Sequence, residues 1–399
     1  MIPPNLKDLV TFVPNKDEPI HDWFYYKEGY SKELVEWLIK EYKLSGPIYD
    51  PFAGVGTTLL VAKSLGMKSI GTDVSPLTSF ICNVKTRSYD TNILKAELDE
   101  IAKLKPENVG KYPNKKIREL FRAENLDDIY YYHQKIFEIK DEKVKDLFML
   151  ALIDTTGRVA NVIKTGGSLK KVKKHHMDVK KLFLGKIKRM ILDIERMENK
   201  RKQLMENKNK QQNEIREKHN TTQNIGQTFE ANKIPEPIEP IIYNEDARTL
   251  KLEENSIGCV ITSPPYLNKI EYTSVYKMEL GLFFDEQETR LRSYVGDIPT
   301  VEAGEYAGLP DIAIAYFQDM KKVLENIYFC LKLKGKAFII VAGGCLPDKT
   351  IDSDTIIAED AKKVGFTLID IITAREVACV TNRTQHIGRV KEVIIVLEK

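Results

Sequence analysis

The sequence predicts an α/β protein in which a large, mostly helical insertion interrupts a parallel, doubly wound sheet. A β-α-β pattern occupies residues 47–73, and strand and helix patterns alternate again over residues 241–399. Between them, residues 89–217 show a long, charged, helical pattern. Because a β-α-β unit joins parallel strands, the two outer parts are expected to complete one sheet. We therefore divide the chain into residues 1–90, 91–240 and 241–399.

The first part contains a helix followed by the β-α-β unit. The pattern predicts a helix over residues 31–44 with Ser31 as its N-cap, because Leu34, Leu38 and Ile39 then share one face. The unit itself comprises a strand over 47–50, a glycine-rich turn, a helix over 57–65 and a second strand over 68–73.

The middle part is predicted to be helical and largely exposed. Apolar residues recur at helical spacing in two stripes, Phe148, Met149, Leu152 and Ile153, and then Phe183, Ile187, Ile191 and Ile194. Residues 199–224 are almost purely polar, which predicts an exposed helix or a disordered link. Residues 235–240 contain three prolines and predict a stiff, extended connector.

The last part returns to alternating elements. Strands are predicted over 241–243, 258–262, 337–342, 367–373 and 392–398, and helices over 313–331 and 356–364. Residues 381–386 are predicted to be a loop, either a plain hairpin loop or one that reaches the rim of the active site. Residues 268–310 are long for a loop, and their tyrosines could line a channel for the target base or simply pack.

Composition excludes several classes of protein. No apolar run reaches the length of about 18 residues that a membrane span requires. The N-terminus lacks the basic-then-apolar pattern of a signal peptide, so we expect a cytoplasmic protein. The 5 cysteines form no C-x-x-C pair and the 6 histidines form no H-E-x-x-H, so neither a disulfide scaffold nor a metal site is expected.

The charge is concentrated in one stretch. The chain has a net charge of +3, yet residues 164–218 contain 18 Lys and Arg against 7 Asp and Glu. This stretch therefore has a net charge of +11, and the remainder has −8. A basic block of this kind is the usual electrostatic footprint of nucleic-acid binding, although a solvated helix face would look the same. The exposed candidates for nucleic-acid contact are Lys170, Lys171, Lys173 and Lys174.

A glycine-rich turn follows the first predicted strand. Gly54 and Gly56 allow the backbone to approach a ligand where a Cβ would clash. The turn lacks the third glycine of the dinucleotide fingerprint, which disfavours a pyrophosphate ligand. The whole string is Asp50-Pro51-Phe52-Ala53-Gly54-Val55-Gly56-Thr57-Thr58.

Two acidic residues follow neighbouring strands. Asp73 ends the second strand and precedes Val74 and Ser75, where a carboxylate can accept the ribose hydroxyls of a nucleoside ligand. Asp246 and Ala247 follow the predicted strand at 241–243. Each aspartate could alternatively be an ordinary helix cap or turn residue.

The segment Ser263-Pro264-Pro265-Tyr266 follows a buried, apolar strand. Two prolines end the strand ladder and restrict the local backbone. An exocyclic base amine is a poor nucleophile, because its lone pair is delocalised into the ring. The Ser263 hydroxyl and the Pro264 carbonyl are suitable acceptors for such an amine, and Tyr266 can stack on the base. Catalysis here would consist of positioning and acceptor electrostatics.

Together these strings resemble the amino-group DNA methyltransferases. The D-P-F-A-G-x-G-T-T string resembles their motif I and S-P-P-Y their motif IV, in the form typical of cytosine-N4 enzymes. Asn244 to Arg248 resembles motif III, whose acidic residue faces the cofactor adenine. Residues 21–31, which include Tyr26 and Lys27, resemble motif X, which closes over the methionine part of the cofactor; an aromatic cluster of the core would give the same pattern.

The resemblance implies a seven-stranded, Rossmann-like fold that binds S-adenosylmethionine. The implied cofactor-binding residues are Tyr26, Lys27, Asp50, Pro51, Phe52, Gly54, Gly56, Thr57, Thr58, Asp73, Val74, Ser75, Asp246 and Ala247, and the implied catalytic residues are Ser263, Pro264, Pro265 and Tyr266. It also implies double-stranded DNA as substrate, a flipped-out cytosine and a cognate restriction endonuclease as a further partner. The insertion is the candidate target-recognition region, and Arg383 is a candidate DNA contact.

Three alternatives stay open at this point. Adenine-N6 enzymes usually have Asp or Asn in place of Ser263. RNA base methyltransferases share the glycine-rich turn and a P-P-Y site, but usually have an RNA-binding domain before the catalytic fold. A nucleic-acid-binding protein with an inactive fold would bind cofactor without transferring a methyl group. A cytosine-C5 enzyme is disfavoured, because it needs a nucleophilic Cys, typically beside Pro, and the chain contains no Pro-Cys pair.

Overall fold

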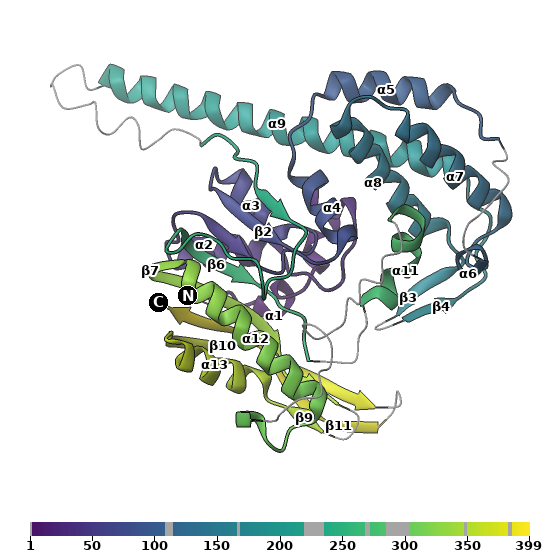
Figure 1. The fold of residues 1–399 in the computed structure, drawn as a ribbon. Coiled ribbons are helices and arrows are strands. Elements are labelled where there is room, and N and C mark those ends of the chain that lie inside the picture. The colour runs from purple at the N-terminus through teal and green to yellow at the C-terminus, as the bar shows by residue number, and fades with distance from the viewer. Residues whose placement is uncertain are drawn as a thin grey trace.

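A seven-stranded sheet forms the centre of one half of the chain, and a helical unit forms the other half (Figure 1). The computed structural model describes residues 2–107, 115–165, 168–218, 235–267, 272–284, 304–346, 349–381 and 385–399. The sheet contains β1 (Ile48–Asp50), β2 (Ser69–Thr72), β5 (Ile241–Tyr243), β6 (Ile257–Thr262), β7 (Leu331–Ala342), β10 (Thr367–Thr381) and β11 (Gln385–Glu398).

The strand order is β10-β11-β7-β6-β1-β2-β5. Neighbours from β7 to β5 pair in parallel, and β11 pairs antiparallel with both β7 and β10. This arrangement confirms the predicted α/β class with one interrupted sheet. The order reverses between β1 and β6, and ligands of open α/β sheets bind outside the strand ends at such a switch point.

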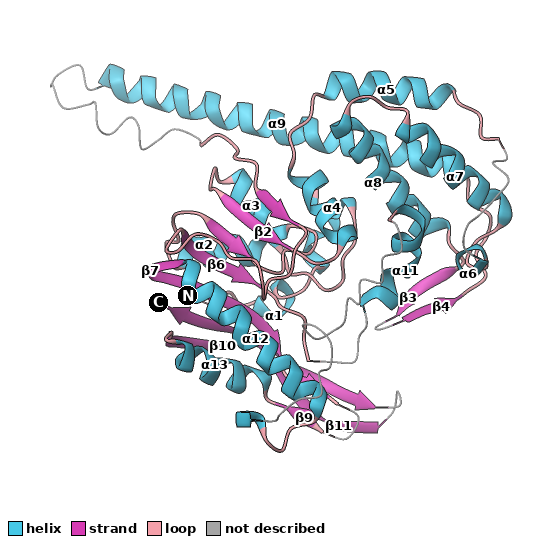
Figure 2. Cartoon of the chain, viewed as in Figure 1, coloured by secondary structure: helices cyan, strands magenta, loops and turns pink. Residues whose placement is uncertain are grey.

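Helices cover both faces of the sheet (Figure 2). On one face, α12 (Asp311–Cys330) and α13 (Ser353–Val364) pack on alternate residues of β7 such as Ile339 and Val341. On the other face, α1 (Leu6–Leu9) and α2 (Lys32–Glu41) pack on Phe338 and Ile340. This alternation is the period of two expected of a strand that is buried on both faces.

The predicted β-α-β unit is confirmed with small shifts at its ends. Ser31 caps α2 by accepting a hydrogen bond from the Leu34 N–H, as predicted. α3 (Thr57–Ser64) joins β1 to β2, and α4 (Pro76–Thr86) then leads towards the insertion. α4 was not predicted from the sequence, and its N-cap is Ser75. Short 3-10 helices, η1 (Val13–Asp17), η2 (His21–Trp23) and η3 (Gly304–Tyr306), lie in the connecting segments.

The insertion is mostly helical, but it is not helical throughout. It contains α5 (Thr91–Lys103), α6 (Lys115–Arg118), α7 (Ala123–Phe137), α8 (Glu142–Val159) and α9 (Val179–Lys218). An antiparallel hairpin of β3 (Val162–Thr165) and β4 (Ser168–Lys171) interrupts the helices, which corrects the prediction of helix over 89–217. The β-branched pair Val162-Ile163 and the Gly166-Gly167 pair in the sequence are hairpin signals, but the surrounding lysines favour helix in a pattern reading.

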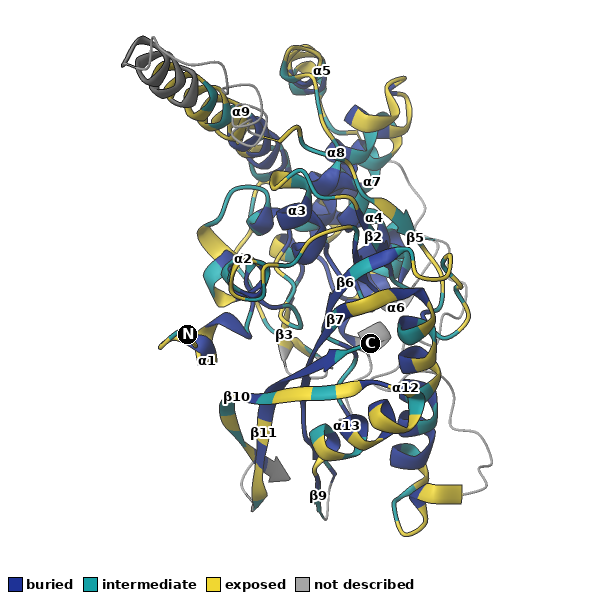
Figure 3. Cartoon of the chain, turned by 90° about the vertical axis from the view of Figure 1, so that its left-hand side faces the viewer, coloured by how far each residue is buried: buried dark blue, intermediate teal, exposed yellow. Residues whose placement is uncertain are grey.

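α9 changes character along its length (Figure 3). Its first half buries Phe183, Ile187 and Ile191. In its second half most of the described side chains are exposed, including Leu204 at 49% exposure. The helix reaches Lys218, so the part of the polar tract 199–224 that the structure describes is helical.

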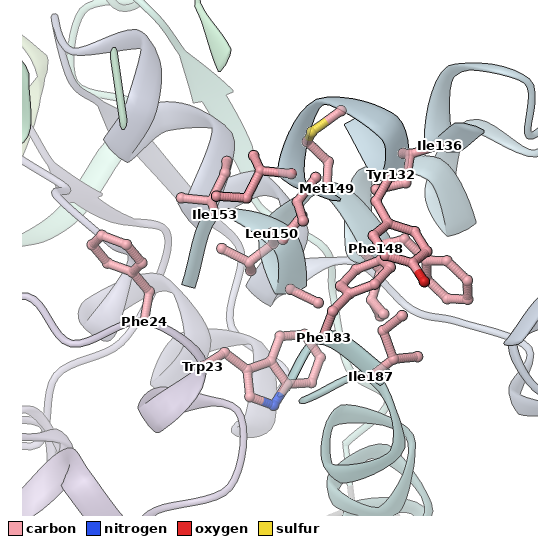
Figure 4. Packing of buried hydrophobic residues seen from close by; sticks show 14 of the residues in the cluster. Trp23, Phe24, Tyr132, Ile136, Phe148, Met149, Leu150, Ile153, Phe183 and Ile187 are labelled. Carbon is pink, nitrogen blue, oxygen red and sulfur yellow. The ribbon is translucent and has the colours of Figure 1, made fainter. Parts of the chain in front are cut away.

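The core of the helical unit includes residues from outside the insertion. Trp23 and Phe24 pack in the same apolar cluster as Leu150 of α8 and Phe183 of α9 (Figure 4). The Trp23 indole N–H donates to the Asp193 carboxylate at 3.1 Å. α11 (Tyr272–Phe283) adds Tyr276 and its neighbours to this cluster. The helical unit is therefore packed against both outer parts of the chain.

One disulfide joins Cys345 of β8 (Gly344–Cys345) to Cys379 of β10. β8 pairs with β9 (Thr350–Ile351), beside the long β10–β11 hairpin. The sequence disfavours a disulfide scaffold, and it does not predict this single bridge. The two cysteines are 34 residues apart on separate strands, a proximity that cysteine spacing does not encode. None of the described helices has both the length and the apolar character needed to cross a bilayer.

Candidate active site

The motif residues gather at the carboxyl ends of four adjacent strands. The glycine-rich turn follows β1, Asp73 follows β2, Asp246 follows β5 and Ser263 follows β6. These strands are neighbours in the order β6-β1-β2-β5. Segments that are about 200 residues apart in sequence therefore share one edge of the sheet.

The glycine-rich turn is built for close approach. Gly54 and Gly56 have φ values of 52° and 83°, which L side chains rarely adopt. A Cβ on Gly56 would lie 2.6 Å from the Cys82 Sγ, and a Cβ on Gly54 would lie 3.3 Å from the Tyr26 ring. Gly56 is the N-cap of α3, whose Thr57 and Thr58 are buried. Glycine at 54 and 56 is therefore required both by the left-handed backbone and by the close packing of Tyr26 and Cys82 against the turn.

Asp73 braces this cradle from the neighbouring strand. Its Oδ2 accepts the Gly54 N–H at 2.9 Å, and its Oδ1 accepts the Ser75 N–H and the Thr78 hydroxyl at 2.9 and 2.8 Å. Burial raises the pKa of this carboxyl, and the three hydrogen bonds oppose that shift. A carboxylate has about four acceptor positions, so one remains for a ligand hydroxyl. Val74, beside it, is 48% exposed.

Asp50 lies beneath the turn and not in the open crevice. It is 2% exposed, and its Oδ1 accepts the Thr262 hydroxyl at 2.6 Å and the Phe52 N–H at 3.1 Å. Its Oδ2 accepts the Tyr30 hydroxyl at 3.0 Å, and that hydroxyl also contacts the Thr58 hydroxyl at 2.5 Å. We call Asp50, Tyr30, Thr58 and Thr262 the buried aspartate cluster. It joins the end of β1 to the end of β6.

The S-P-P-Y segment leaves β6 directly after Thr262. Pro264 is buried, while Ser263, Pro265 and Tyr266 are partly exposed. The Tyr266 hydroxyl donates to the Glu392 Oε1 at 2.7 Å, and the Ser263 hydroxyl donates to the Tyr266 hydroxyl at 3.4 Å. Glu392 is buried on β11 and forms an ion pair with Arg375 of β10. The Tyr266 hydroxyl is thus held by a residue of the antiparallel strands β10 and β11.

The segment that resembles motif X does reach the glycine turn. Tyr26 lies against Gly54 and stacks on Tyr276, with ring centroids 5.6 Å apart. Lys27 is exposed beside it. The Tyr276 hydroxyl donates to Glu28, whose pKa burial raises.

Asp246 is engaged by a neighbouring cation. Arg248 donates to both oxygens of Asp246 and also to Asp319 of α12 at 3.0 Å. Burial tends to raise the pKa of Asp246, but these bonds and the guanidinium charge lower it overall. Ala247 is buried. The contact of Asp246 with a cofactor adenine stays a prediction, since its oxygens are already paired here.

The basic candidates differ in their surroundings. Lys170 and Lys173 are exposed, whereas Lys171 pairs with Glu119 at 3.2 Å. Lys174 is half-buried and donates to the Arg158 carbonyl at 3.0 Å. Arg383 lies outside the described residues. Among the residues that the structure describes, no group of three or more His, Cys, Asp or Glu could hold a metal ion.

Four residues that organise this edge received no role from the sequence: Glu392 and Arg375, and also Tyr30 and Thr262, which lie within or directly before the motif segments. Glu392 could have been found, because it is a lone acidic residue at the start of the apolar run Val393 to Val396. A charge at such a position requires a buried partner. Tyr30 gives no comparable signal.

Comparison with known proteins points to the same group of enzymes. Residues 8–83 match a family described as DNA methylase. The type II methyltransferase M.BsoBI of Geobacillus stearothermophilus is 32% identical over 300 residues, which cover 71% of this chain and 57% of that protein. M.MjaII of Methanocaldococcus jannaschii is 25% identical over 411 residues, covering 81% and 72%. The chain belongs with the amino-group methyltransferases.

The chain spans 57% and 56% of the lengths of M.BsoBI and of M.AvaI from Nostoc sp.. A solved structure, a putative DNA modification methylase from Thermus thermophilus complexed with S-adenosyl-L-methionine, matches at 17% identity. It covers 39% of this chain and 53% of that chain, with a TM-score of 0.24. The fold assignment therefore rests on the strand order described above.

The buried aspartate cluster makes stability depend on pH. Burial raises the pKa of Asp50 from 3.8 to about 6. The stabilisation that protonated Asp50 provides is thus complete below about pH 4 and is lost as the pH rises through about 6. We expect the free energy of unfolding of the wild type, measured relative to that of Asp50→Asn, to fall by about 2.5 kcal/mol between about pH 4 and pH 7. Denaturant unfolding of both proteins at both pH values measures this change. A wild-type minus variant difference in unfolding free energy that is the same at both pH values would contradict the raised pKa of Asp50.

Proposed function

We propose that this protein transfers a methyl group from S-adenosylmethionine to the exocyclic N4 amine of a cytosine flipped out of duplex DNA, as part of a restriction–modification system. The single observation that supports this most is the S-P-P-Y segment at the end of β6, next to the glycine turn at the end of β1. The relatives named type II methyltransferases support DNA as the substrate.

The residues around the glycine turn suit such a cofactor. The turn at Gly54 and Gly56 opens α3, Asp73 retains an acceptor position for a ribose hydroxyl, and exposed Val74 offers an apolar contact for a purine. Tyr26 covers the other side of the turn. The cofactor, when bound, supplies an electrophilic methyl group on a sulfonium.

The chain's own contribution is positioning and acceptance of hydrogen bonds. Tyr266 would stack on the base and hold its amine in line with the methyl group. Ser263 Oγ and the Pro264 carbonyl would accept the amine protons, which directs the nitrogen lone pair towards the methyl carbon. The N–C bond forms as the S–C bond breaks, and the amine then loses one proton to an acceptor or to water.

Product analysis tests the substrate and the atom together. Purified protein is incubated with tritiated S-adenosylmethionine and mixed-sequence duplex DNA, with tRNA in parallel, and digested nucleosides are identified by mass spectrometry. We expect N4-methylcytosine from the DNA. N6-methyladenine would retain the mechanism but overturn the base assignment, and label only in tRNA would overturn the DNA substrate. Cofactor binding without any transfer would overturn the enzymatic function.

Tyr266 is predicted to act on transfer and not on cofactor binding. Tyr266→Ala should lower the single-turnover transfer rate by roughly 5- to 150-fold, since base–aromatic stacking contributes about 1–3 kcal/mol. Tyr266→Phe retains the ring and should lose far less. Calorimetric cofactor affinity should change by less than about twofold in both variants. A parallel loss of cofactor affinity in Tyr266→Ala would contradict the role.

The exposed lysines of the insertion are predicted to contact phosphates. Reversing Lys170 and Lys173 to Glu should weaken duplex binding and reduce the slope of log K against log salt by about two or more, because each phosphate contact contributes about 0.9. A matched control reverses Lys332 and Lys334, which are exposed at the amino end of β7 on the opposite edge of the sheet. Equal effects in both pairs would show only a general charge effect and would exclude the site.

A further inference from the structure

The β3–β4 hairpin is tied to α11 through a buried charge. Glu279 of α11 is 1% exposed, and its Oε1 accepts a hydrogen bond from the Lys164 ammonium of β3 at 2.6 Å. Its Oε2 has no hydrogen-bond partner among the described residues. A buried carboxylate that loses its cation is strongly destabilised. Lys164 is therefore held against α11, although its side chain remains 31% exposed at the edge of the contact.

The same ammonium lies over an aromatic ring. The Lys164 Nζ is 4.0 Å from the centroid of the Tyr276 ring and 5.3 Å from that of Phe24. A cation at this distance from a partly desolvated ring is attracted to its face. Tyr276 is also held by its hydroxyl, which donates to Glu28 at 2.9 Å.

Tyr276 connects Lys164 to the glycine turn through Tyr26. It stacks on Tyr26 with an interplanar angle of 25°, and the Tyr26 ring contacts Gly54. The Gly54 N–H in turn donates to Asp73. A continuous set of contacts thus runs from β3 through Tyr276 and Tyr26 to the turn.

The two faces of the hairpin have different surroundings. Strand residues alternate between faces, so Lys164 and its cross-strand partner Leu169 lie on the side that packs on the helical unit. Ile163 and its partner Lys170 lie on the other side and are exposed. Lys170 therefore lies on the exposed face of the hairpin. Lys164 lies on the opposite face, where its ammonium contacts Tyr276.

We propose that Lys164 is a positioning residue that couples DNA binding to cofactor binding. Duplex DNA held on the outward face would restrain β3, and Lys164 would then hold Tyr276 and Tyr26 closed over the Gly54 turn. By linkage, DNA raises the affinity for the cofactor and the cofactor raises the affinity for DNA by the same factor. This proposal depends on the proposed function, because it needs both ligands at their assigned sites.

The test is the ratio of cofactor dissociation constants without and with saturating duplex DNA, measured by calorimetry with S-adenosylhomocysteine. Lys164→Met paired with Glu279→Met removes the ammonium without leaving a buried charge unpaired. Lys164→Arg retains both the ion pair and the stacking on Tyr276. The matched control, Lys95→Met with Glu195→Met, removes an ion pair between α5 and α9 in the same helical unit.

We expect a ratio of about five or more in the wild type. The ratio should fall to about one in the Lys164/Glu279 variant, and persist in Lys164→Arg and in the control. A wild-type ratio near one, or a ratio that survives in the Lys164/Glu279 variant, would overturn the proposal. A merely structural role would weaken both affinities but leave the ratio unchanged. Absence of cofactor binding in the wild type would instead overturn the proposed function itself.

Discussion

A buried carboxylate beneath the switch point of the sheet organises the rest of the site. Asp50 accepts from Thr262 on β6, from Tyr30 upstream of α2 and from the Phe52 N–H of the glycine turn. These bonds offset part of the cost of burying it, which still raises its pKa to about 6. The ends of β1 and β6 are thereby held in register. The glycine turn and the S-P-P-Y segment start from these two ends, so the cluster sets their relative position.

The helical unit depends on both outer parts of the chain. Trp23 enters its core from the N-terminal side, and Tyr276 enters it from α11, only a few residues beyond Tyr266. The insertion is therefore not an appendage joined by two linkers. Its packing is continuous with the segments that cover the cofactor turn and follow the S-P-P-Y segment. This continuity gives a physical route for a ligand on one part to influence the other.

Local patterns were sufficient for the sheet and for the motif positions. β1 and β6 are short apolar runs followed by turn-forming residues. Gly54 and Gly56 indicate a turn whose backbone conformation other residues rarely adopt. The hairpin was missed because Lys164, Lys170 and Lys171 look like a solvated helix face in one dimension. The Glu392–Tyr266 bond and the Cys345–Cys379 bridge depend on which strands become neighbours, and residue spacing does not encode that. Asp246 and Arg248 are two residues apart, so their pairing could be expected from the sequence. That Asp319 of α12 also holds Arg248 depends on the tertiary structure.

The central claim is that one crevice, at the carboxyl ends of β1 and β6, holds both reactants. A crystal structure with bound S-adenosylmethionine measures this most directly. The account predicts the ribose beside Asp73, the sulfonium above the turn at Gly54 and the methyl group directed towards Ser263 and the Pro264 carbonyl. A cofactor bound elsewhere on the chain, or one bound here with its methyl group directed away from Ser263, would contradict it.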